Sequence, residues 1–299
     1  MATIPATAAP PLAIRPPAAL GRAGLLAQAR ALGAVIWREW LIFIRYPSWV
    51  VSMFIWPLIF PAAYLLSARA LAGPDGSGMA LFAKAAGTSD YIGYIAIGTT
   101  IWMWQNVSLW TIGLALRSEQ MRGTLESNWL TPATRLWYLL GSGITQGLML
   151  LSFLVISGLE FGLFFGVRLN GNPLLVLLVL VAAVPCIYGL GFTFASVVLA
   201  AREANAFVFL VRGLVMVFCG ISFPLAVLPG WMQAVAAWLP PTYVIHGIRA
   251  AALGNASLTE LLPDLLALAG FGVLWLALGY LAFVWMERRA RRTGSLGQY

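Results

Sequence analysis

The sequence predicts an all-α membrane protein with six transmembrane helices. Of its 299 residues, 61% are hydrophobic and only 9% are charged, whereas about 25% of the residues of a soluble globular domain are charged. The mean hydropathy is +0.87, so the excess apolar side chains need lipid rather than water around them. Six separate segments are long and apolar enough to cross a hydrocarbon core, which takes about 20 helical residues.

Composition also excludes several kinds of site. One histidine and two cysteines cannot form a His/Cys metal cluster. Cys186 and Cys219 lie in apolar runs, where a thiol usually behaves as a small hydrophobe, so we expect no metal site and no disulfide framework. The cations that give the net charge of +8 are scattered along the chain, without the basic domain that nucleic-acid binding needs. No nucleic-acid partner is expected.

Two elements precede the first span. Residues 1–23 are rich in Ala and Pro and lack the features of a signal peptide, so we expect a flexible cytosolic tail. Residues 24–46 place Trp37, Trp40 and Ile44 at helical spacing among several arginines. Indole rings and arginines both settle well at a membrane surface. This segment is therefore predicted to be an interfacial amphipathic helix.

The six predicted spans are separated by turn signals rich in proline, glycine and asparagine. The spans are 47–68, 91–116, 137–166, 173–200, 205–222 and 264–286. They make up one membrane domain of residues 47–289, and residues 290–299 are expected to form a cytosolic C-terminal tail.

The basic residues predict the orientation, because cytoplasmic loops of membrane proteins carry an excess of Lys and Arg. With the amino terminus inside, thirteen basic residues lie on the inner side and four on the outer side. The inner ones are Arg15, Arg22, Arg30, Arg38, Arg45, Arg117, Arg122, Arg135, Arg202, Arg288, Arg289, Arg291 and Arg292, and the outer ones are Arg69, Lys84, Arg168 and Arg249. Both termini are therefore predicted to be cytosolic.

Residues 222–255 do not fit a simple loop. They are too apolar for water and too interrupted by proline to span, so we expect short helices that dip part-way into the outer leaflet as a re-entrant hairpin. The residues that define this outer segment are Pro224, Pro229, Trp231, Pro240, Pro241 and Tyr243.

The loop after the second span has an amphipathic pattern. At helical spacing Glu119, Arg122 and Glu126 share one face, and Met121 and Leu125 lie on another. Periodicity alone leaves two interpretations open, which are an ordinary interfacial loop helix and a docking helix for a cytosolic partner.

A few polar residues lie within the spans. Arg212 and Glu160 are ionisable, and placing such a group at the bilayer centre costs about 2.5 to 3.5 kcal/mol. Each is either a substrate contact or a group that snorkels or pairs internally. The amides of Gln105 and Asn106 need a polar partner or a water-filled surface, so interhelical hydrogen bonding and a transport route both remain open.

Two motifs together resemble the ABC-2 type permeases, the membrane subunits of ABC exporters. The first is Glu119-x-x-Arg122-Gly123-Thr124-Leu125-Glu126 followed by Thr131-Pro132, after the second of six spans. The second is the proline-broken outer segment with Leu239-Pro240-Pro241-Thr242-Tyr243 and Arg249 before the last span. The likeness extends from about residue 31 to residue 289.

The resemblance implies how the chain works and with which partners. Residues 117–132 would be the coupling helix that docks into a cytosolic ATPase, present in two copies, and a second permease, expected to be a copy of this chain, would complete the complex. Contacts to the ATPase would come from Glu119, Arg122, Gly123, Thr124, Leu125, Glu126, Thr131 and Pro132. ATP and Mg would be bound by that ATPase, since the only lysine, Lys84, is not part of a phosphate-binding loop. This chain is thus expected to bind no cofactor and to be no enzyme.

In similar exporters the second and fifth spans line the transport route. The matching residues here are Trp102, Gln105, Asn106, Arg212 and Met216. The family implies export by alternating access of a hydrophobic or amphipathic substrate, such as a drug, lipid, glycolipid or polysaccharide chain. We expect a bacterial inner (plasma) membrane as the location, with lipid around the spans.

Two other functions are weighed against this one. An integral-membrane lipid-modifying enzyme would need clustered acids or histidines, and the sequence offers only Glu260 and Asp264 within four residues of each other. An ion-coupled secondary transporter would show inverted repeats and broken helices with charges at the midplane, and no such repeat is visible.

Overall fold

The computed structural model describes residues 25–73, 77–113, 123, 135–167, 170–200 and 204–293, and every regular element in these ranges is a helix. The α-helices are α1 (Leu25–Arg45), α2 (Pro47–Leu71), α3 (Ser77–Ala86), α4 (Tyr91–Thr111), α7 (Arg135–Phe165), α8 (Pro173–Ala200), α9 (Ala204–Phe218), α10 (Gly230–Ala236), α11 (Pro240–Leu253) and α12 (Leu258–Thr293), with a 3-10 turn η1 (Leu225–Val227). For this part of the chain the all-α class predicted from the sequence is confirmed.

Four of these helices are long and apolar enough to cross a membrane. The qualifying stretches are Val50–Leu71, Gly143–Phe165, Pro173–Ser196 and Leu258–Met286, and Val208–Phe218 is a shorter apolar helix. At 1.5 Å per residue, the 15 residues of α9 extend over only about 22 Å, less than the hydrocarbon thickness of about 30 Å. The chain is thus a multi-pass membrane protein, and the count of six spans stays a prediction.

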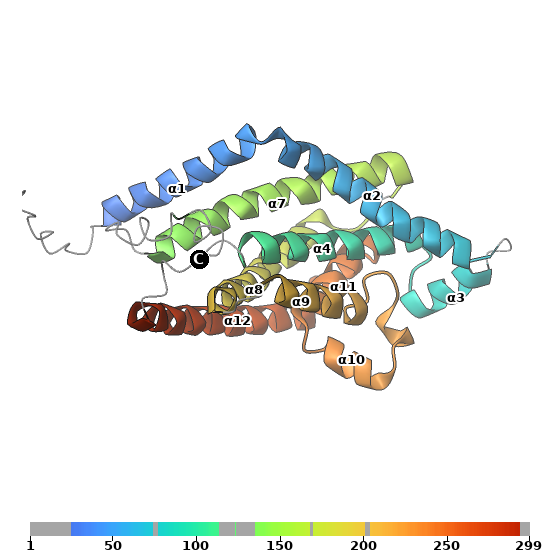
Figure 1. Cartoon of the computed structure of the whole chain (residues 1–299). Helices are drawn as coiled ribbons and strands as arrows, with labels where there is room; N and C mark the ends of the chain where they lie inside the picture. The colour runs from blue at the N-terminus through green and yellow to red at the C-terminus, as the bar shows by residue number, and fades with distance from the viewer. Residues whose placement is uncertain are drawn as a thin grey trace, which may run out of the picture.

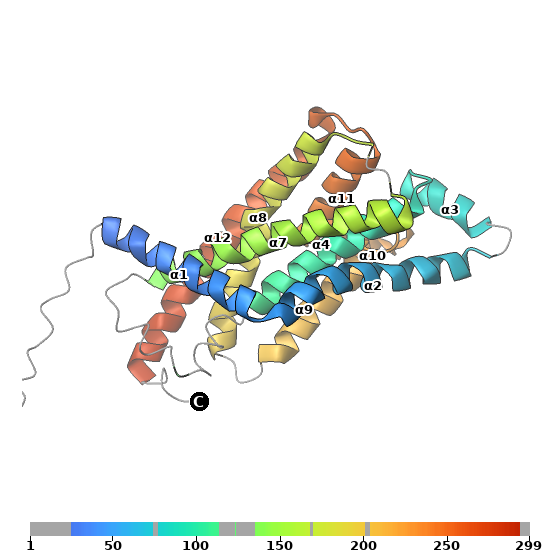
Figure 2. The ribbon, with the colours of Figure 1, turned by 90° about the horizontal axis from the view of Figure 1, so that it is seen from above.

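Helix α4 lies inside the bundle rather than at its surface. It contacts α2, α7, α8, α9 and α11, and in Figure 1 it runs between α2 and α9. Most of its residues are buried. Its polar side chains Thr99, Gln105, Asn106 and Ser108 therefore face protein. Seen from above in Figure 2, α4 passes beneath α7 and beside α2.

The α8–α12 pair is the most extensive helix contact in the chain. Small residues allow it, as is common in membrane helix pairs. A Cβ atom on Gly189 would lie 2.8 Å from the Leu276 nitrogen, and one on Gly279 would lie 2.6 Å from the Phe192 ring. Thr193 adds a hydrogen bond from its hydroxyl to the Trp275 carbonyl at 3.1 Å.

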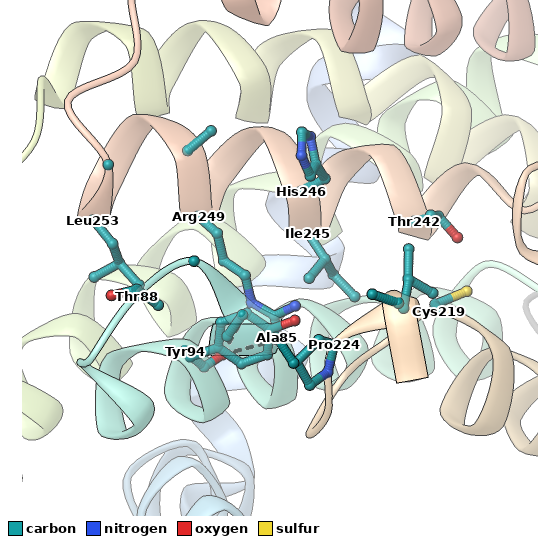
Figure 3. Close-up of a pocket in the computed structure, with 16 residues that line it drawn as sticks. Ala85, Thr88, Tyr94, Cys219, Pro224, Thr242, Ile245, His246, Arg249 and Leu253 are labelled. Carbon is teal, nitrogen blue, oxygen red and sulfur yellow. Dashed lines mark hydrogen bonds between the residues drawn. The ribbon is translucent and has the colours of Figure 1, made fainter. Parts of the chain in front are cut away.

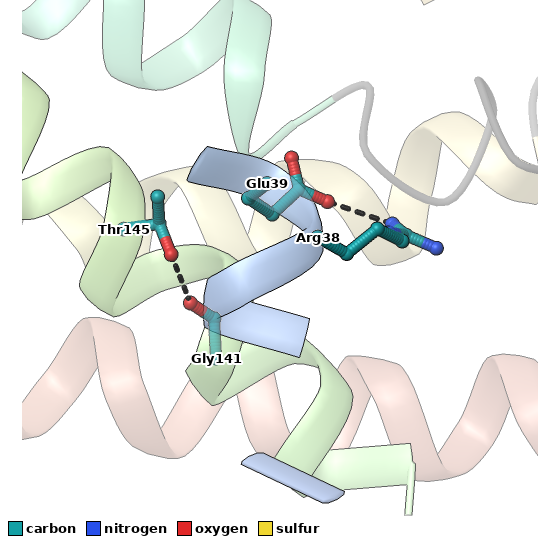
Figure 4. A network of polar contacts seen from close by, with 4 residues as sticks. All are labelled: Arg38, Glu39, Gly141 and Thr145. Atoms are coloured by element: carbon teal, nitrogen blue, oxygen red, sulfur yellow. Dashed lines mark hydrogen bonds and ion pairs between the residues drawn. The ribbon is translucent and has the colours of Figure 1, made fainter. Parts of the chain in front are cut away.

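The N-terminal helix α1 packs along α7, as Figure 4 shows. A Cβ on Gly141 of α7 would meet Val35 of α1 at 2.9 Å, so the two backbones approach closely there. On α1, Arg38 pairs with Glu39 at 2.7 Å. The helix is interrupted at Tyr46, between α1 and α2, because the residue before a proline avoids the helical conformation.

Three boundaries differ from the sequence prediction. Helix α9 ends at Phe218 rather than at 222, because Gly220 takes a positive φ of 65°. Helix α12 begins at Leu258 rather than at 264, because Glu260 accepts a hydrogen bond from the Ser257 amide at 2.8 Å and caps the first turn. It also continues to Thr293, beyond the predicted start of the tail at 290. The segment after the first span, predicted as a turn, contains the helix α3.

The start of α1 and the end of α12 lie on the same side of the bundle. In Figure 1 the start of α1 and the end of α12 lie at one end, and α3 and α10 lie at the other. Short helices α10 and α11 replace a loop between α9 and α12, as the sequence predicts for the outer segment.

Candidate transport pathway and outer segment

The predicted coupling residues lie outside the described residues, with one exception. Gly123 is exposed and takes a positive φ of 70°, the left-handed region that favours glycine. The contacts proposed for Glu119, Arg122, Thr124, Leu125, Glu126, Thr131 and Pro132 therefore stay predictions.

Three of the predicted pathway residues come together with two aromatic residues of α2. The Arg212 guanidinium lies 4.7 Å from the centre of the Trp102 ring, and the Trp102 indole nitrogen donates to the Arg212 carbonyl at 3.3 Å. Phe60 stacks on the Trp102 ring, with ring centres 4.7 Å apart. The Tyr64 hydroxyl contacts the Met216 sulfur at 3.8 Å. We call Phe60, Tyr64, Trp102, Arg212 and Met216 the Arg212 cluster.

The charge of Arg212 is only partly compensated within this chain. Among the described residues no acidic side chain forms an ion pair with it. A cation on an aromatic face gains about 0.5 to 2 kcal/mol, whereas an arginine at the bilayer centre costs about 2.5 to 3.5 kcal/mol. The contact with Trp102 therefore does not offset the cost in full. The half-buried guanidinium needs water or another partner on its open side.

Gln105 and Asn106 lie in the interior of the chain. Both are buried, with exposures of 2% and 8%. The Asn106 amide donates to the Trp102 carbonyl of its own helix at 2.8 Å, but its oxygen and that of Gln105 have no hydrogen-bond partner. Buried polar atoms nearly always form hydrogen bonds in proteins. The described part of α4 therefore carries two buried oxygens that can still accept a hydrogen bond. Whether Asn106 faces the route stays a prediction.

An arginine of α11 holds the outer segment to α4. Arg249 of α11 donates through Nε and Nη2 to the Tyr94 carbonyl at 3.1 and 2.9 Å, through Nη1 to the Gly220 carbonyl at 2.8 Å, and through Nη2 to the Ile221 carbonyl at 2.7 Å. We call these four residues the Arg249 anchor. Burial lowers the pKa of Arg249 to about 10, which leaves it protonated at neutral pH.

Two glycines make this arrangement sterically possible. A Cβ on Gly98 of α4 would collide with the Ile221 carbonyl and with the Arg249 guanidinium. Gly220 reaches its positive φ without the penalty that other residues meet, which turns the chain after α9 and presents two adjacent carbonyls to Arg249. The anchor thus joins α4, the end of α9 and α11.

The predicted outer residues occupy the short helices between α9 and α12. Pro240 and Pro241 are buried in the first turn of α11, where a missing N–H costs little. The Tyr243 hydroxyl donates to the Ala237 carbonyl at 2.9 Å and closes the turn between α10 and α11. Trp231 of α10 is exposed and packs edge-on against Phe218. Pro224 precedes η1 and is buried, and Pro229 caps α10.

A cavity of about 360 Å³ lies beside the anchor. Figure 3 shows the residues that line it, among them Thr88, Tyr94, Pro224, Thr242 and Arg249. None of the five predicted pathway residues lines it. The cavity therefore belongs to the outer segment rather than to the Arg212 cluster.

The single histidine joins α11 to the first turns of α12. The His246 Nδ1 atom lies 2.7 Å from a carboxylate oxygen of Asp264, whose side chain is buried while the imidazole is exposed. The hydrogen bond to Asp264 raises the pKa of His246, against the opposing effect of the nearby Arg249 charge. This pair adds a polar contact between α11 and α12.

Sequence reasoning missed three of these features. The partition of basic residues treats Arg249 as an outer charge, whereas the structure gives it a role in joining three helices. The Ser257-x-x-Glu260 spacing is a capping-box pattern that predicts the start of α12. The His246–Asp264 contact joins residues 18 positions apart on different helices, and no local pattern predicts it.

Comparison with known families agrees with the fold. An all-helical, multi-pass chain with a polar central helix and a proline-broken outer segment has the properties of a transporter membrane subunit. Residues 50–281 match the model of the ABC-2 family transporter proteins. The chain belongs to this family, as its two motifs predict, and such membrane subunits work with an ABC ATPase subunit. A comparison with curated proteins gives no match.

Proposed function

We propose that this chain is the permease subunit of an ATP-driven exporter that moves a hydrophobic or amphipathic substrate out of the cytosol or the inner leaflet. The observation that carries the proposal is the family match over residues 50–281. Candidate cargoes are those of the family, which are drugs, lipids, glycolipids and polysaccharide chains.

The energy for transport comes from a separate ATPase in this proposal. Two copies of the ATPase hold ATP and Mg, and this chain binds no cofactor and has no enzymatic activity of its own. Support comes from the sequence, since Lys84 follows no phosphate-binding glycine pattern. Residues 117–132 form the coupling helix, and closure of the ATPase dimer pushes on it.

The route lies between two permeases, the second being a copy of this chain. Support comes from α4 and α9, which carry the polar residues of the Arg212 cluster next to exposed apolar residues such as Phe209 and Leu214. Alternating access would change which end of this surface is open, because ATPase closure favours one of two arrangements of the permeases. Both termini are cytosolic, as the partition of basic residues supports. The membrane in this proposal is the inner (plasma) membrane of a bacterium.

A charge reversal in the coupling helix tests this function. Glu126→Arg should lower substrate-stimulated ATPase activity and transport together, while membrane insertion stays intact. A suitable control is Lys84→Glu, which reverses a charge on the exposed α3 and should leave both activities unchanged. Normal coupled turnover in the Glu126→Arg variant would contradict the proposed role of the helix.

A further inference from the structure

The Arg212 cluster combines one positive charge with neighbouring side chains that are mostly apolar and aromatic. Trp102 and Phe60 form a stacked pair beneath the guanidinium. Tyr64 lies close enough to interact electrostatically with Arg212 and also contacts Met216. The side chains come from three helices, and the pair Tyr64 and Met216 is separated by 152 residues in the sequence. The cluster is thus a tertiary feature built around one cation.

Arg212 and Trp102 lie near the middle of their helices. Arg212 is eight residues from the start of α9, which is about 12 Å along the helix axis, and Trp102 is eleven residues from the start of α4, about 16 Å. The described residues offer Arg212 no acidic partner there. An anion with an apolar tail pairs with the guanidinium and places its tail against the apolar side chains around Arg212.

The open side of the cluster is apolar. On α9, Phe209, Arg212 and Met216 follow the i, i+3, i+7 spacing of one helix face. Phe209 is 57% exposed and Met216 is 39% exposed, whereas Val208 and Val215 on the adjoining face are buried in the core. Arg212 is therefore the single charged group on an otherwise hydrophobic exposed face of α9 within the described residues.

We propose that the Arg212 cluster binds the acidic head of an amphipathic anion, with the acyl or alkyl chain lying against Phe209 and Met216. The planar guanidinium can donate two parallel hydrogen bonds to a phosphate or carboxylate while it stays on the Trp102 ring. This inference rests on the proposed function, because it names the substrate class of the same route.

Direct binding to the full chain, without the ATPase, tests the proposal. The chain is reconstituted in phosphatidylcholine nanodiscs and titrated with ³²P-labelled dodecyl phosphate, with empty nanodiscs as the background. Saturable binding should weaken about tenfold or more in Arg212→Gln, the effect expected when a charge-assisted hydrogen bond is lost. Arg212→Lys, which keeps the charge, should weaken it less. Arg288→Gln, which removes a cation near the end of α12, should leave the affinity unchanged.

Competitors identify the chemistry of the ligand. Dodecyl maltoside has the chain without the charge and should compete equally in wild type and in Arg212→Gln. Inorganic phosphate has the charge without the chain and should compete far more weakly than dodecyl phosphate. Phosphatidylglycerol in the nanodisc distinguishes the source of the ligand. If this lipid competes with dodecyl phosphate, the site is assigned to an anionic membrane lipid. If it does not compete, the site is assigned to a single-chain anion.

Three results would overturn the inference. They are unchanged affinity in a folded Arg212→Gln variant, equal competition by inorganic phosphate, and equal binding of dodecyltrimethylammonium. The melting temperature of each variant shows whether it is folded, and Arg212→Lys keeps the test decisive if Arg212→Gln is unstable. Because no ATPase takes part, a negative binding result leaves the coupling test of Glu126 standing, and a negative coupling result leaves anion binding standing.

Discussion

The Arg249 guanidinium carbon lies 3.3 Å from the centre of the Tyr94 ring, and two of its nitrogens donate to the Tyr94 carbonyl. One side chain of the outer segment thus holds both the ring and the backbone of the first turn of α4. The same guanidinium reaches the two carbonyls that follow α9. The start of α4 and the end of α9 are therefore joined by α11.

Removing this arginine should destabilise the protein strongly. Arg249→Ala leaves three buried carbonyls without their donor, and an unsatisfied buried polar group costs about 1 to 3 kcal/mol. We expect the free energy of unfolding to fall by at least about 2 kcal/mol, measured by chemical denaturation in one detergent. Arg69→Ala is the control, because Arg69 is exposed and makes one hydrogen bond, to the Tyr91 hydroxyl. A loss no larger than that of the control would contradict the anchor.

A glycine pair tests the close approach on which the anchor depends. In Gly98→Ala the new methyl group collides with the Ile221 carbonyl and Arg249, so α4 and the turn after α9 must move apart. Gly270→Ala on α12 adds the same methyl group where no atom lies within 4 Å. The melting temperature should fall in the first variant and stay equal or rise in the second, since alanine favours a helix over glycine. Equal melting temperatures would mean that the contact at Gly98 relaxes freely.

The helices themselves follow from local sequence, but the contacts between them do not. Long apolar runs bounded by Pro47 and Pro173 predict α2 and α8 closely, because proline starts a helix well and continues one badly. The predicted start of the last span at 264 is six residues too late, because α12 includes Pro263 in its second turn. Tyr94 lies 155 residues from Arg249, and Trp102 lies 110 residues from Arg212. Only the folded chain brings them together.

The stabilising effect of the contact between His246 of α11 and Asp264 of α12 should depend on pH. Since the Asp264 carboxylate raises the pKa of His246, the stabilising effect is complete below the ordinary pKa of about 6.5 and is lost as the pH rises through the higher folded-state value. The chain has one histidine, so ¹⁵N-histidine labelling, with a purification tag free of histidine, reports this residue alone. In Asp264→Asn the pKa should drop. An unchanged pKa in that variant would show that the pair does not form.

Cysteine labelling on intact cells tests the orientation. Cys186 and Cys219 are free and buried, and replacing both by alanine gives a background for single cysteines. Ser257→Cys, at the exposed turn before α12, should react with an impermeant maleimide, whereas Ser127→Cys in the predicted coupling loop should react only after permeabilisation. The reverse pattern would overturn the assignment of both termini to the cytosol.

Asn106→Leu separates a role in the route from a role in helix packing. The Asn106 oxygen is buried without a hydrogen-bond partner, and its amide bonds only to its own helix at Trp102. Leucine removes an uncompensated polar atom, and replacement of polar groups by apolar ones of similar shape is close to neutral. We therefore expect an unchanged or slightly higher melting temperature. If the oxygen serves substrate, the set of compounds that stimulates the ATPase should change in the same preparation. A lower melting temperature with an unaltered substrate profile would instead assign Asn106 to packing, and Trp102 with Arg212 would then carry the polar part of the route without it.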